Sequence, residues 1–281
     1  MVMSTNGMVI TDLDGTLFQK NHRISDRNYQ TLLDLGERAI VRVIATGRSL
    51  FSAYKVLPLE FPIDFLVFSS GAGIIAWARQ ELLFSASMNQ EEVALAFEAL
   101  SRRSLDFMVH RPIPDNHHFL YFASGQQNPD FEDRCTLYRD FAAPGRRQDK
   151  PPGEACQLVA IEPFFRLTSC FSEIREELDS LAVIRTTSPL DGRSRWIEIF
   201  SNQVSKAQAS VRIARNLGVR EDRIMAIGND FNDLDLLGWA SRSFVVNDAP
   251  GELLARFPRV RSGDESDFSE AVVQWRQELG F

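Results

Sequence analysis

The sequence has few cysteines and no long hydrophobic segment. Its three cysteines, Cys135, Cys156 and Cys170, are far apart and form no Cys-x-x-Cys pair, which excludes a disulfide framework or a cysteine zinc site and predicts buried, reduced thiols. No apolar stretch approaches the roughly 20 residues that cross a bilayer. Residues 1–8 also lack the basic and hydrophobic regions of a signal peptide. We therefore expect a cytoplasmic protein with no membrane partner.

The sequence also has no excess of basic residues. It contains 31 Lys and Arg against 38 Asp and Glu, a formal net charge of −7. Proteins that bind nucleic acids gain affinity by neutralising backbone phosphates with Lys and Arg, so this balance predicts no nucleic-acid partner. A phosphate-bearing ligand should instead be small and held by a few local groups.

Two aspartates stand out after the first apolar run, Met8-Val9-Ile10, in the segment Asp12-Leu13-Asp14-Gly15. Alternate side chains of an extended strand point the same way, so the carboxylates of Asp12 and Asp14 should lie together. Gly15 would let the chain turn and offer its N–H to an anion. One carboxylate can attack phosphorus while its neighbour handles the proton of the leaving group. The alternative is an ordinary turn, in which Asp and Gly are common.

Apolar strands alternate with helices at both ends of the chain. Strand 8–10, a helix that begins after Ser25 and ends near Gly36, and strand 41–46 have the length of one right-handed βαβ unit. A third strand at 65–70 indicates an α/β fold with a doubly wound, mostly parallel sheet and a site at its carboxyl edge. The same rhythm returns near the C-terminus, with helices at 205–217, 234–239 and 266–279 and strands at 224–227 and 244–246.

Between these two α/β segments, helices and strands follow in a different order. The predicted helices there are 89–101, 130–141 and 172–181, and the predicted strands are 107–109, 119–122, 158–161, 183–185 and 196–199. Such a long mixed segment forms a domain rather than a loop. We expect a catalytic core of residues 1–83 and 199–281, with an inserted α+β cap domain at 84–198.

Three further segments bring polar groups to the same predicted edge: Thr46-Gly47-Arg48, Lys206 and the loop Gly228–Asp233. The Thr46 hydroxyl and the N–H groups that follow it can hold phosphate oxygens. Lys206, one of four lysines, can offset phosphate charge; the alternative is a solvated helix lysine. Arg48 could contact substrate or pair with a carboxylate. The Gly228–Asp233 loop could complete an oxygen-ligand Mg²⁺ site with Asp12.

This set of motifs, in this order, resembles the haloacid dehalogenase-like hydrolases over the whole chain. The short interval between Asp12 and Thr46 and the long one before Lys206 resemble the type II cap arrangement. Together with the α/β cap and the Val204-Ser205-Lys206 motif, they resemble the Cof-like sugar-phosphate phosphatases of subclass IIB. The resemblance implies a Rossmann-like core, Mg²⁺, and hydrolysis of a small phosphorylated metabolite such as a sugar phosphate.

The resemblance also implies roles for individual residues. Asp12 would be the nucleophile and a metal ligand, and Asp14 the acid/base whose main-chain carbonyl also binds the metal. The other implied roles are phosphate binding by Thr46, Gly47, Lys206 and Asn232, metal binding by Asn229 and Asp233, and support of substrate or metal by Gly15, Arg48 and Asp230.

The chain departs from the family pattern at two places. Asn229 stands where many relatives have Asp, so either a neutral amide replaces a metal-binding carboxylate or Asp230 or Asp233 takes over. Ser69-Ser70-Gly71 stands where relatives often have Ser-Asn-Gly. Two alternatives to hydrolysis stay open: phosphoryl transfer as in phosphomutases, and a non-catalytic protein that binds a phosphorylated metabolite.

Overall fold

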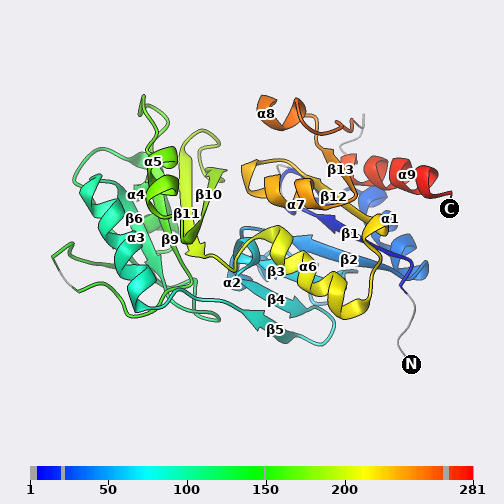
Figure 1. Ribbon diagram of the computed structural model, residues 1–281, viewed down its shortest axis with the longest axis horizontal. Coiled ribbons are helices and arrows are strands. Elements are labelled where there is room, and N and C mark those ends of the chain that lie inside the picture. The colour runs from blue at the N-terminus through cyan, green and yellow to red at the C-terminus, as the bar shows by residue number, and fades with distance from the viewer. Residues whose placement is uncertain (1–4, 20–22, 149, 262–265, 281) are drawn as a thin grey trace. The chain divides into compact units, whose positions relative to one another are not determined.

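The computed structural model describes residues 5–19, 23–148, 150–261 and 266–280. The chain divides into two compact units, one of Met1–Phe84 with Ser205–Phe281 and the other of Ser85–Val204 (Figure 1). The second boundary falls later than the one predicted after residue 198, because strand β11 (Arg195–Ser201) continues past that point within the inserted unit. None of the described helices is both long and apolar enough to span a membrane.

The first unit is built on one sheet with the strand order β13-β12-β1-β2-β3-β4-β5. Its strands are β1 (Gly7–Thr11), β2 (Ile40–Ala45), β3 (Phe65–Phe68), β4 (Gly73–Ala76), β5 (Glu81–Ser85), β12 (Ile224–Gly228) and β13 (Arg242–Val245). Strands β13 to β3 run parallel, while β4 pairs antiparallel with β3. The prediction of an α/β fold with a doubly wound, mostly parallel sheet is therefore confirmed.

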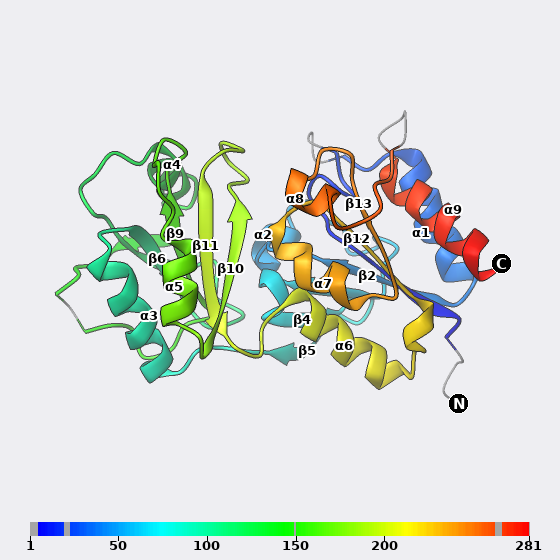
Figure 2. The same ribbon diagram turned by 45° about the horizontal axis from the view of Figure 1, so that its top comes forward.

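Helices cover both faces of this sheet. They are α1 (Asp26–Glu37), α2 (Leu50–Ala53), α6 (Lys206–Leu217), α7 (Leu234–Trp239), α8 (Gly251–Leu254) and α9 (Asp267–Leu279). Right-handed crossovers that run in opposite directions from the middle of the sheet place α1 and α7 on opposite faces. Figures 1 and 2 show α6 beside α7 and α1 beside α9. A hydrogen bond of 2.9 Å between the hydroxyls of Thr31 and Ser269 joins the second pair.

Local sequence signals fix the start and end of the helices that matter for the site. The Ser25 hydroxyl accepts the N–H of Asn28 and so caps α1, as the sequence predicts. The Ser205 hydroxyl accepts the N–H of Gln208 at 3.1 Å and caps α6, which makes Lys206 the first residue of that helix. Gly218 ends α6 in the left-handed conformation, with φ of 65°.

The inserted unit has a second sheet, with the order β10-β11-β9-β6-β7-β8 and antiparallel pairing except between β7 and β8. Its other strands are β6 (Asp106–His110), β7 (Phe119–Phe122), β8 (Ala142–Pro144), β9 (Gln157–Glu162) and β10 (Leu181–Thr187), and its helices are α3 (Gln90–Arg102), α4 (Pro129–Leu137) and α5 (Phe171–Glu177). Phe97 of α3 and Ile174 of α5 pack on one face of the sheet, and Phe131 of α4 packs on the other.

Several predicted elements were wrong in extent or missing. The helix predicted over 130–141 ends at Leu137, because Ala142 pairs with Phe119 in the short strand β8. The helix predicted over 172–181 ends at Glu177, because Leu181 already pairs with Ser201 in the sheet. Strands β4 and β5 were not predicted. For the two shortened helices, pairing with a strand about twenty residues away decided the conformation, and local sequence carries little signal for such pairing. Strand β4 instead pairs with β3 directly before it, from Phe68 opposite Gly73 to Phe65 opposite Ala76.

The prediction of three buried thiols holds for Cys156 alone. Cys135 and Cys170 are half-buried, and all three cysteines are free.

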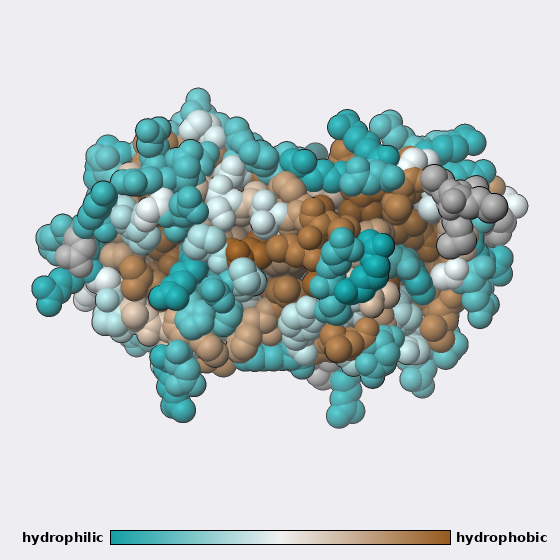
Figure 3. All heavy atoms as spheres, turned by 90° about the horizontal axis from the view of Figure 1, so that it is seen from below, coloured by the Kyte–Doolittle hydropathy of each residue, from teal (hydrophilic) through white to brown (hydrophobic). Residues whose placement is uncertain are grey.

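Much of the face shown in Figure 3 is hydrophilic, although hydrophobic residues also reach it. Exposed hydrophobic side chains of this kind are normal on globular proteins.

Candidate active site

The register of the first sheet brings the predicted motifs to one edge. Thr11, the last residue of β1, lies opposite Ile44 of β2 and Ile227 of β12. The residues that follow these parallel strands therefore emerge at the same carboxyl edge. The Asp12 N–H still donates to the Ile227 carbonyl, at 3.0 Å, which fixes the start of the Asp12–Gly15 turn against β12.

A buried ammonium group joins two carboxylates at this edge. Lys206 Nζ donates to Asp12 Oδ1 at 2.7 Å and to Asp233 Oδ1 at 2.6 Å. Lys206 is only 1% exposed, so the alternative of a solvated helix lysine does not apply. The two carboxylates raise the pKa of Lys206 above its ordinary value, against the opposing effect of burial, and keep the ammonium charged.

Only one of the two carboxylate oxygens of Asp12 accepts a hydrogen bond from the described residues. Lys206 binds Oδ1, and no other described residue donates to Oδ2. Burial raises the pKa of the Asp12 carboxyl to about 7, with Lys206 opposing the rise and Asp233 adding to it. An added phosphate or cation would meet a carboxylate oxygen that is poorly solvated and not already hydrogen-bonded.

Both carboxylate oxygens of Asp233 accept hydrogen bonds from N–H groups. Its Oδ1 accepts from Lys206, and its Oδ2 accepts from the main-chain N–H groups of Asn229 at 2.9 Å and Asp230 at 3.2 Å. An added Cβ on Gly228 would lie 2.5 Å from the Asp233 carboxyl carbon, so only glycine lets this side chain approach. In this structure, Asp233 holds Lys206 and shapes the loop.

Arg48 pairs with Asp14 through two parallel hydrogen bonds. Nε donates to Asp14 Oδ2 at 2.6 Å and Nη2 donates to Oδ1 at 2.7 Å, while Nη1 donates to the Ser52 hydroxyl at 3.2 Å. Of the two roles left open for Arg48, the structure shows the ion pair with a carboxylate. Ser52 was not predicted as a site residue, although its place in α2, four residues after Arg48, is a signal that could have found it.

Asn229 contacts the other part of Asp14. Its side-chain Nδ2 donates to the main-chain carbonyl of Asp14 at 2.8 Å. Gly15 has φ of 77° and would place an added Cβ 2.5 Å from this amide, so the turn requires glycine. The Gly15 N–H donates to the Phe18 carbonyl at 2.9 Å. The expected contact between this N–H and an anion is therefore not supported, because the turn itself uses the donor.

The predicted phosphate-binding groups lie at the same edge of the sheet, on loops and at the start of α6. Thr46 is 1% exposed, and its hydroxyl accepts the main-chain N–H of Arg48 at 3.1 Å, which leaves the hydroxyl proton to donate elsewhere. A Cβ added to Gly47 would lie 3.7 Å from Asn232 Nδ2, which places Asn232 beside the Thr46–Gly47 loop. Lys206 reaches the same edge through Asp12.

The donor set at this edge fits a hard divalent cation. Asp12 offers a carboxylate oxygen and Asp14 a main-chain carbonyl, both oxygen donors of the kind that Mg²⁺ takes in proteins. Asn229 now donates its Nδ2 to the Asp14 carbonyl at 2.8 Å, so its amide would have to turn to present its oxygen to the same cation. Among the described residues, no three His, Cys, Asp or Glu side chains are grouped so that they could hold a metal. A site here would therefore depend on carbonyl and amide oxygens as well as on carboxylates.

Comparisons with known proteins identify the family of this chain. The model of the haloacid dehalogenase-like hydrolase family matches residues 9–266. The chain belongs to this family. The family predicted from the sequence motifs is thus confirmed, and the match spans both units of this haloacid dehalogenase-like hydrolase.

Individual relatives are distant but cover nearly the whole hydrolase. It is 24% identical to the HMP-PP phosphatase of Klebsiella pneumoniae, over 89% of this chain and 87% of that protein. It is also 24% identical to the 5-amino-6-(5-phospho-D-ribitylamino)uracil phosphatase YwtE of Bacillus subtilis, over 95% of this chain and 96% of that protein. The solved structure of BT4131, a subclass IIB sugar phosphatase, superposes with a TM-score of 0.72 at 17% identity and covers 98% of this chain and 99% of that one. This likeness shows a shared fold.

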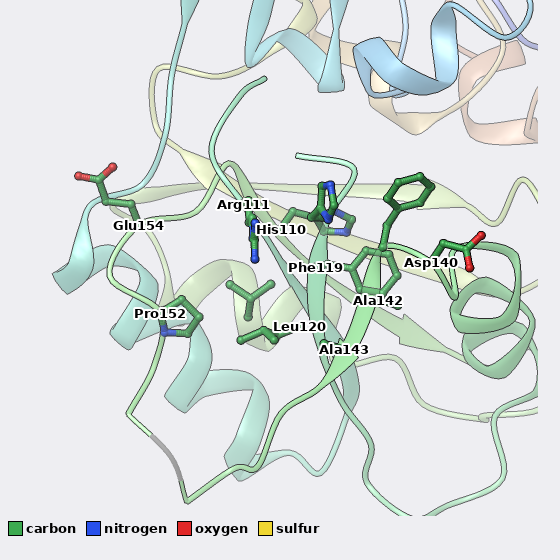
Figure 4. A pocket seen from close by; sticks show the side chains of 12 residues that line it. His110, Arg111, Phe119, Leu120, Asp140, Ala142, Ala143, Pro152 and Glu154 are labelled. Carbon is green, nitrogen blue, oxygen red and sulfur yellow. The ribbon is translucent and has the colours of Figure 1, made fainter. Parts of the chain in front are cut away.

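The inserted unit contains a cavity of its own, of about 300 Å³. Figure 4 shows Leu120 and Pro152 on one side of the lining and His110, Phe119 and Asp140 on the other. The His110 imidazole is 3% exposed, and its Nδ1 donates to the Asn116 carbonyl at 2.8 Å. Burial lowers the pKa of His110 to about 3, and the Arg134 cation adds to this effect. His110 is therefore neutral near pH 7.

Proposed function

We propose that this hydrolase is a Mg²⁺-dependent phosphatase that acts on a small phosphorylated metabolite, with a sugar phosphate as the first candidate. The observation that carries the proposal is the state of Asp12. Its Oδ1 is bound by the buried Lys206 ammonium at 2.7 Å, while its Oδ2 has no donor among the described residues. A carboxylate held in this way can attack phosphorus with one oxygen while its neighbouring cation offsets negative charge.

The proposed reaction has two steps. In the first, Asp12 Oδ2 forms a bond to phosphorus, the bond between phosphorus and the ester oxygen breaks, and Asp14 gives a proton to the departing oxygen. In the second, Asp14 takes a proton from water, the water oxygen bonds to phosphorus, and the bond to Asp12 breaks to release inorganic phosphate. Thr46, Gly47, Lys206 and Asn232 would hold the phosphate oxygens.

We assign Mg²⁺ to Asp12, the Asp14 carbonyl and Asn229. When bound, the ion would neutralise charge on the phosphoryl group. Asp233 is better suited to holding Lys206, because both of its oxygens already accept N–H groups. Asp230 reciprocally caps the short turn Phe231–Asp233 with Asp233, so we place it in support of the loop.

Substrate selection would come from the inserted unit, Ser85–Val204, which carries none of these residues. The printed names of the relatives include phosphatases of HMP-PP, of a ribitylamino-uracil phosphate and of sugars. They support a small phosphorylated metabolite as the class and leave the choice within that class to experiment.

The test is a phosphate-release screen with Mg²⁺ over sugar phosphates, polyol phosphates, nucleotides, cofactor phosphates and HMP-PP. Asp12→Asn should abolish release, and Asp222→Asn, which changes an exposed carboxylate paired with Arg220, should leave it unchanged. Transfer of phosphate to a second sugar without release would instead indicate a mutase. No turnover on the whole panel would indicate a binding protein and overturn the proposal.

A further inference from the structure

The segment Ser69–Gly71, a short 3₁₀ turn labelled η1, directly follows strand β3 and has an unusual backbone. Ser69, Ser70 and Gly71 have φ of 48°, 54° and 105°. Left-handed backbone is unfavourable for residues with a Cβ, and two such residues in succession persist only where their surroundings hold them. All three residues are buried, so these surroundings are protein.

One side of the Ser69–Gly71 turn holds the loop proposed to bind phosphate. The Ser70 N–H donates to the Thr46 carbonyl at 3.0 Å, and the Ser69 N–H donates to the Arg48 carbonyl at 2.8 Å. The left-handed backbone at both serines turns these two successive N–H groups toward the same loop. The turn thereby fixes the main chain on both sides of Gly47.

The other side of the turn contacts the start of α6. A Cβ added to Gly71 would lie 2.2 Å from the Ser205 carbonyl oxygen and 2.5 Å from its carbon. These are main-chain atoms, so no side-chain rotation could relieve the clash. Ser205 caps α6 and precedes Lys206, whose Nζ reaches Asp12 at 2.7 Å. The absence of a side chain at Gly71 therefore sets how closely Lys206 approaches the nucleophile.

We propose that the Ser69–Gly71 turn is a positioning device that sets the spacing between the Thr46–Arg48 loop and Lys206. None of its residues need contact substrate; they act through the two segments that do. The inference rests on the proposed function in one respect, because it takes Thr46 and Lys206 as the two sides of a phosphate site.

The first test compares two glycines that share a positive φ. Gly71→Ala and Gly218→Ala both place a Cβ on left-handed backbone, but nothing lies within 4 Å of the Cβ added at Gly218. We expect Gly71→Ala to weaken calorimetric binding of inorganic phosphate with Mg²⁺ at least about tenfold and to lower kcat/KM on the order of 10²-fold, the cost of roughly 1 Å of displacement. Gly218→Ala should stay within about twofold of wild type in both measurements. Wild-type phosphate affinity in folded Gly71→Ala would overturn the proposal.

A second pair of variants covers the case in which Gly71→Ala does not fold. Asn tolerates left-handed backbone and Val does not, so Ser70→Asn should keep wild-type phosphate affinity while Ser70→Val loses it. Equal affinity in these two variants, both folded by circular dichroism, would show that backbone conformation at Ser70 does not position the loop.

The outcomes also separate this inference from the proposed function. If wild type binds phosphate but hydrolyses no ester, the proposed function fails and the binding comparisons still decide the role of the turn. If wild type binds no phosphate, crystal structures of wild type and Gly71→Ala test the role of the Ser69–Gly71 turn instead. An unchanged Lys206–Asp12 contact in that variant would overturn the proposal, and a lengthened contact would support it.

Discussion

The guanidinium of Arg48 donates to both carboxylate oxygens of Asp14, at 2.6 and 2.7 Å. This pair orients the side chain proposed as the acid/base and also occupies both of its oxygens. A proton passed from Asp14 to an ester oxygen would leave a carboxylate that is already paired with Arg48. Arg48 is thus positioned to influence proton transfer at Asp14.

We predict that Arg48→Lys lowers kcat for an alkyl phosphate by about 10- to 100-fold, because an ammonium group keeps the charge but cannot reproduce the two parallel bonds. The loss should be much smaller with p-nitrophenyl phosphate, whose leaving group needs little protonation. The measurement is kcat for both substrates in wild type and variant.

Arg42→Lys is the matched control. Arg42 makes the same kind of two-bond pair with Asp64 in the same unit, at 3.0 and 2.8 Å, but it lies outside the proposed site. It should change stability without changing the ratio of the two rates. Equal losses on both substrates in Arg48→Lys would show that Arg48 does not act through Asp14.

Asn229→Asp tests the amide in the metal site. Without metal, the new carboxylate would face the Asp14 carbonyl that now accepts the Asn229 amide N–H at 2.8 Å, so the melting temperature in EDTA should fall. With Mg²⁺, the added charge should lower the metal concentration needed for half-maximal activity. Titration of activity and melting temperature with Mg²⁺ checks both expectations. Loss of metal binding in this variant would mean that the amide is specifically required.

His110 should make the stability of the protein depend on pH. Burial and Arg134 lower its pKa to about 3 from an ordinary value of 6.5, so between these values the unfolded chain binds a proton that the native protein does not. The stabilisation is present above pH 6.5 and is lost as pH falls toward 3. His110→Gln should reduce the pH slope of the unfolding free energy by up to about 1.4 kcal/mol per pH unit within this window.

Urea unfolding at several values between pH 4.5 and 7.5 measures these slopes. The difference between wild type and His110→Gln removes the contribution of every other titrating group. Parallel curves for the two proteins would contradict a buried neutral imidazole at this position.

The core of the fold and the members of the site were predictable because both rest on local signals. Apolar strands that end in Asp12, Thr46 and Gly228, with helix caps such as Ser25, place their polar ends at one sheet edge in any parallel α/β fold. The family resemblance then named the residues that follow those strands.

The partners of those residues could not be predicted in the same way. Asp233 was predicted to hold metal, and no sequence signal predicted that it also binds Lys206 and two main-chain N–H groups, because these contacts depend on distances between separate segments. The Gly15 N–H was expected to face an anion and instead closes its own turn on Phe18. Strand β8 likewise depends on a partner strand far away in the sequence. Sequence patterns predict which polar side chains lie at the same sheet edge, but they say little about which hydrogen bonds these side chains make.

The most direct test of the account is to trap phosphate on Asp12. In Asp14→Asn, p-nitrophenyl phosphate should still react, because its leaving group needs no acid, but water would not be activated to release the phosphoryl group. We predict a burst of p-nitrophenolate equal to the enzyme present, and a peptide containing Asp12 that gains the mass of one phosphoryl group. The Asp12→Asn/Asp14→Asn double variant should show neither. Steady turnover without a burst, or a phosphoryl group on another residue, would contradict Asp12 as the nucleophile.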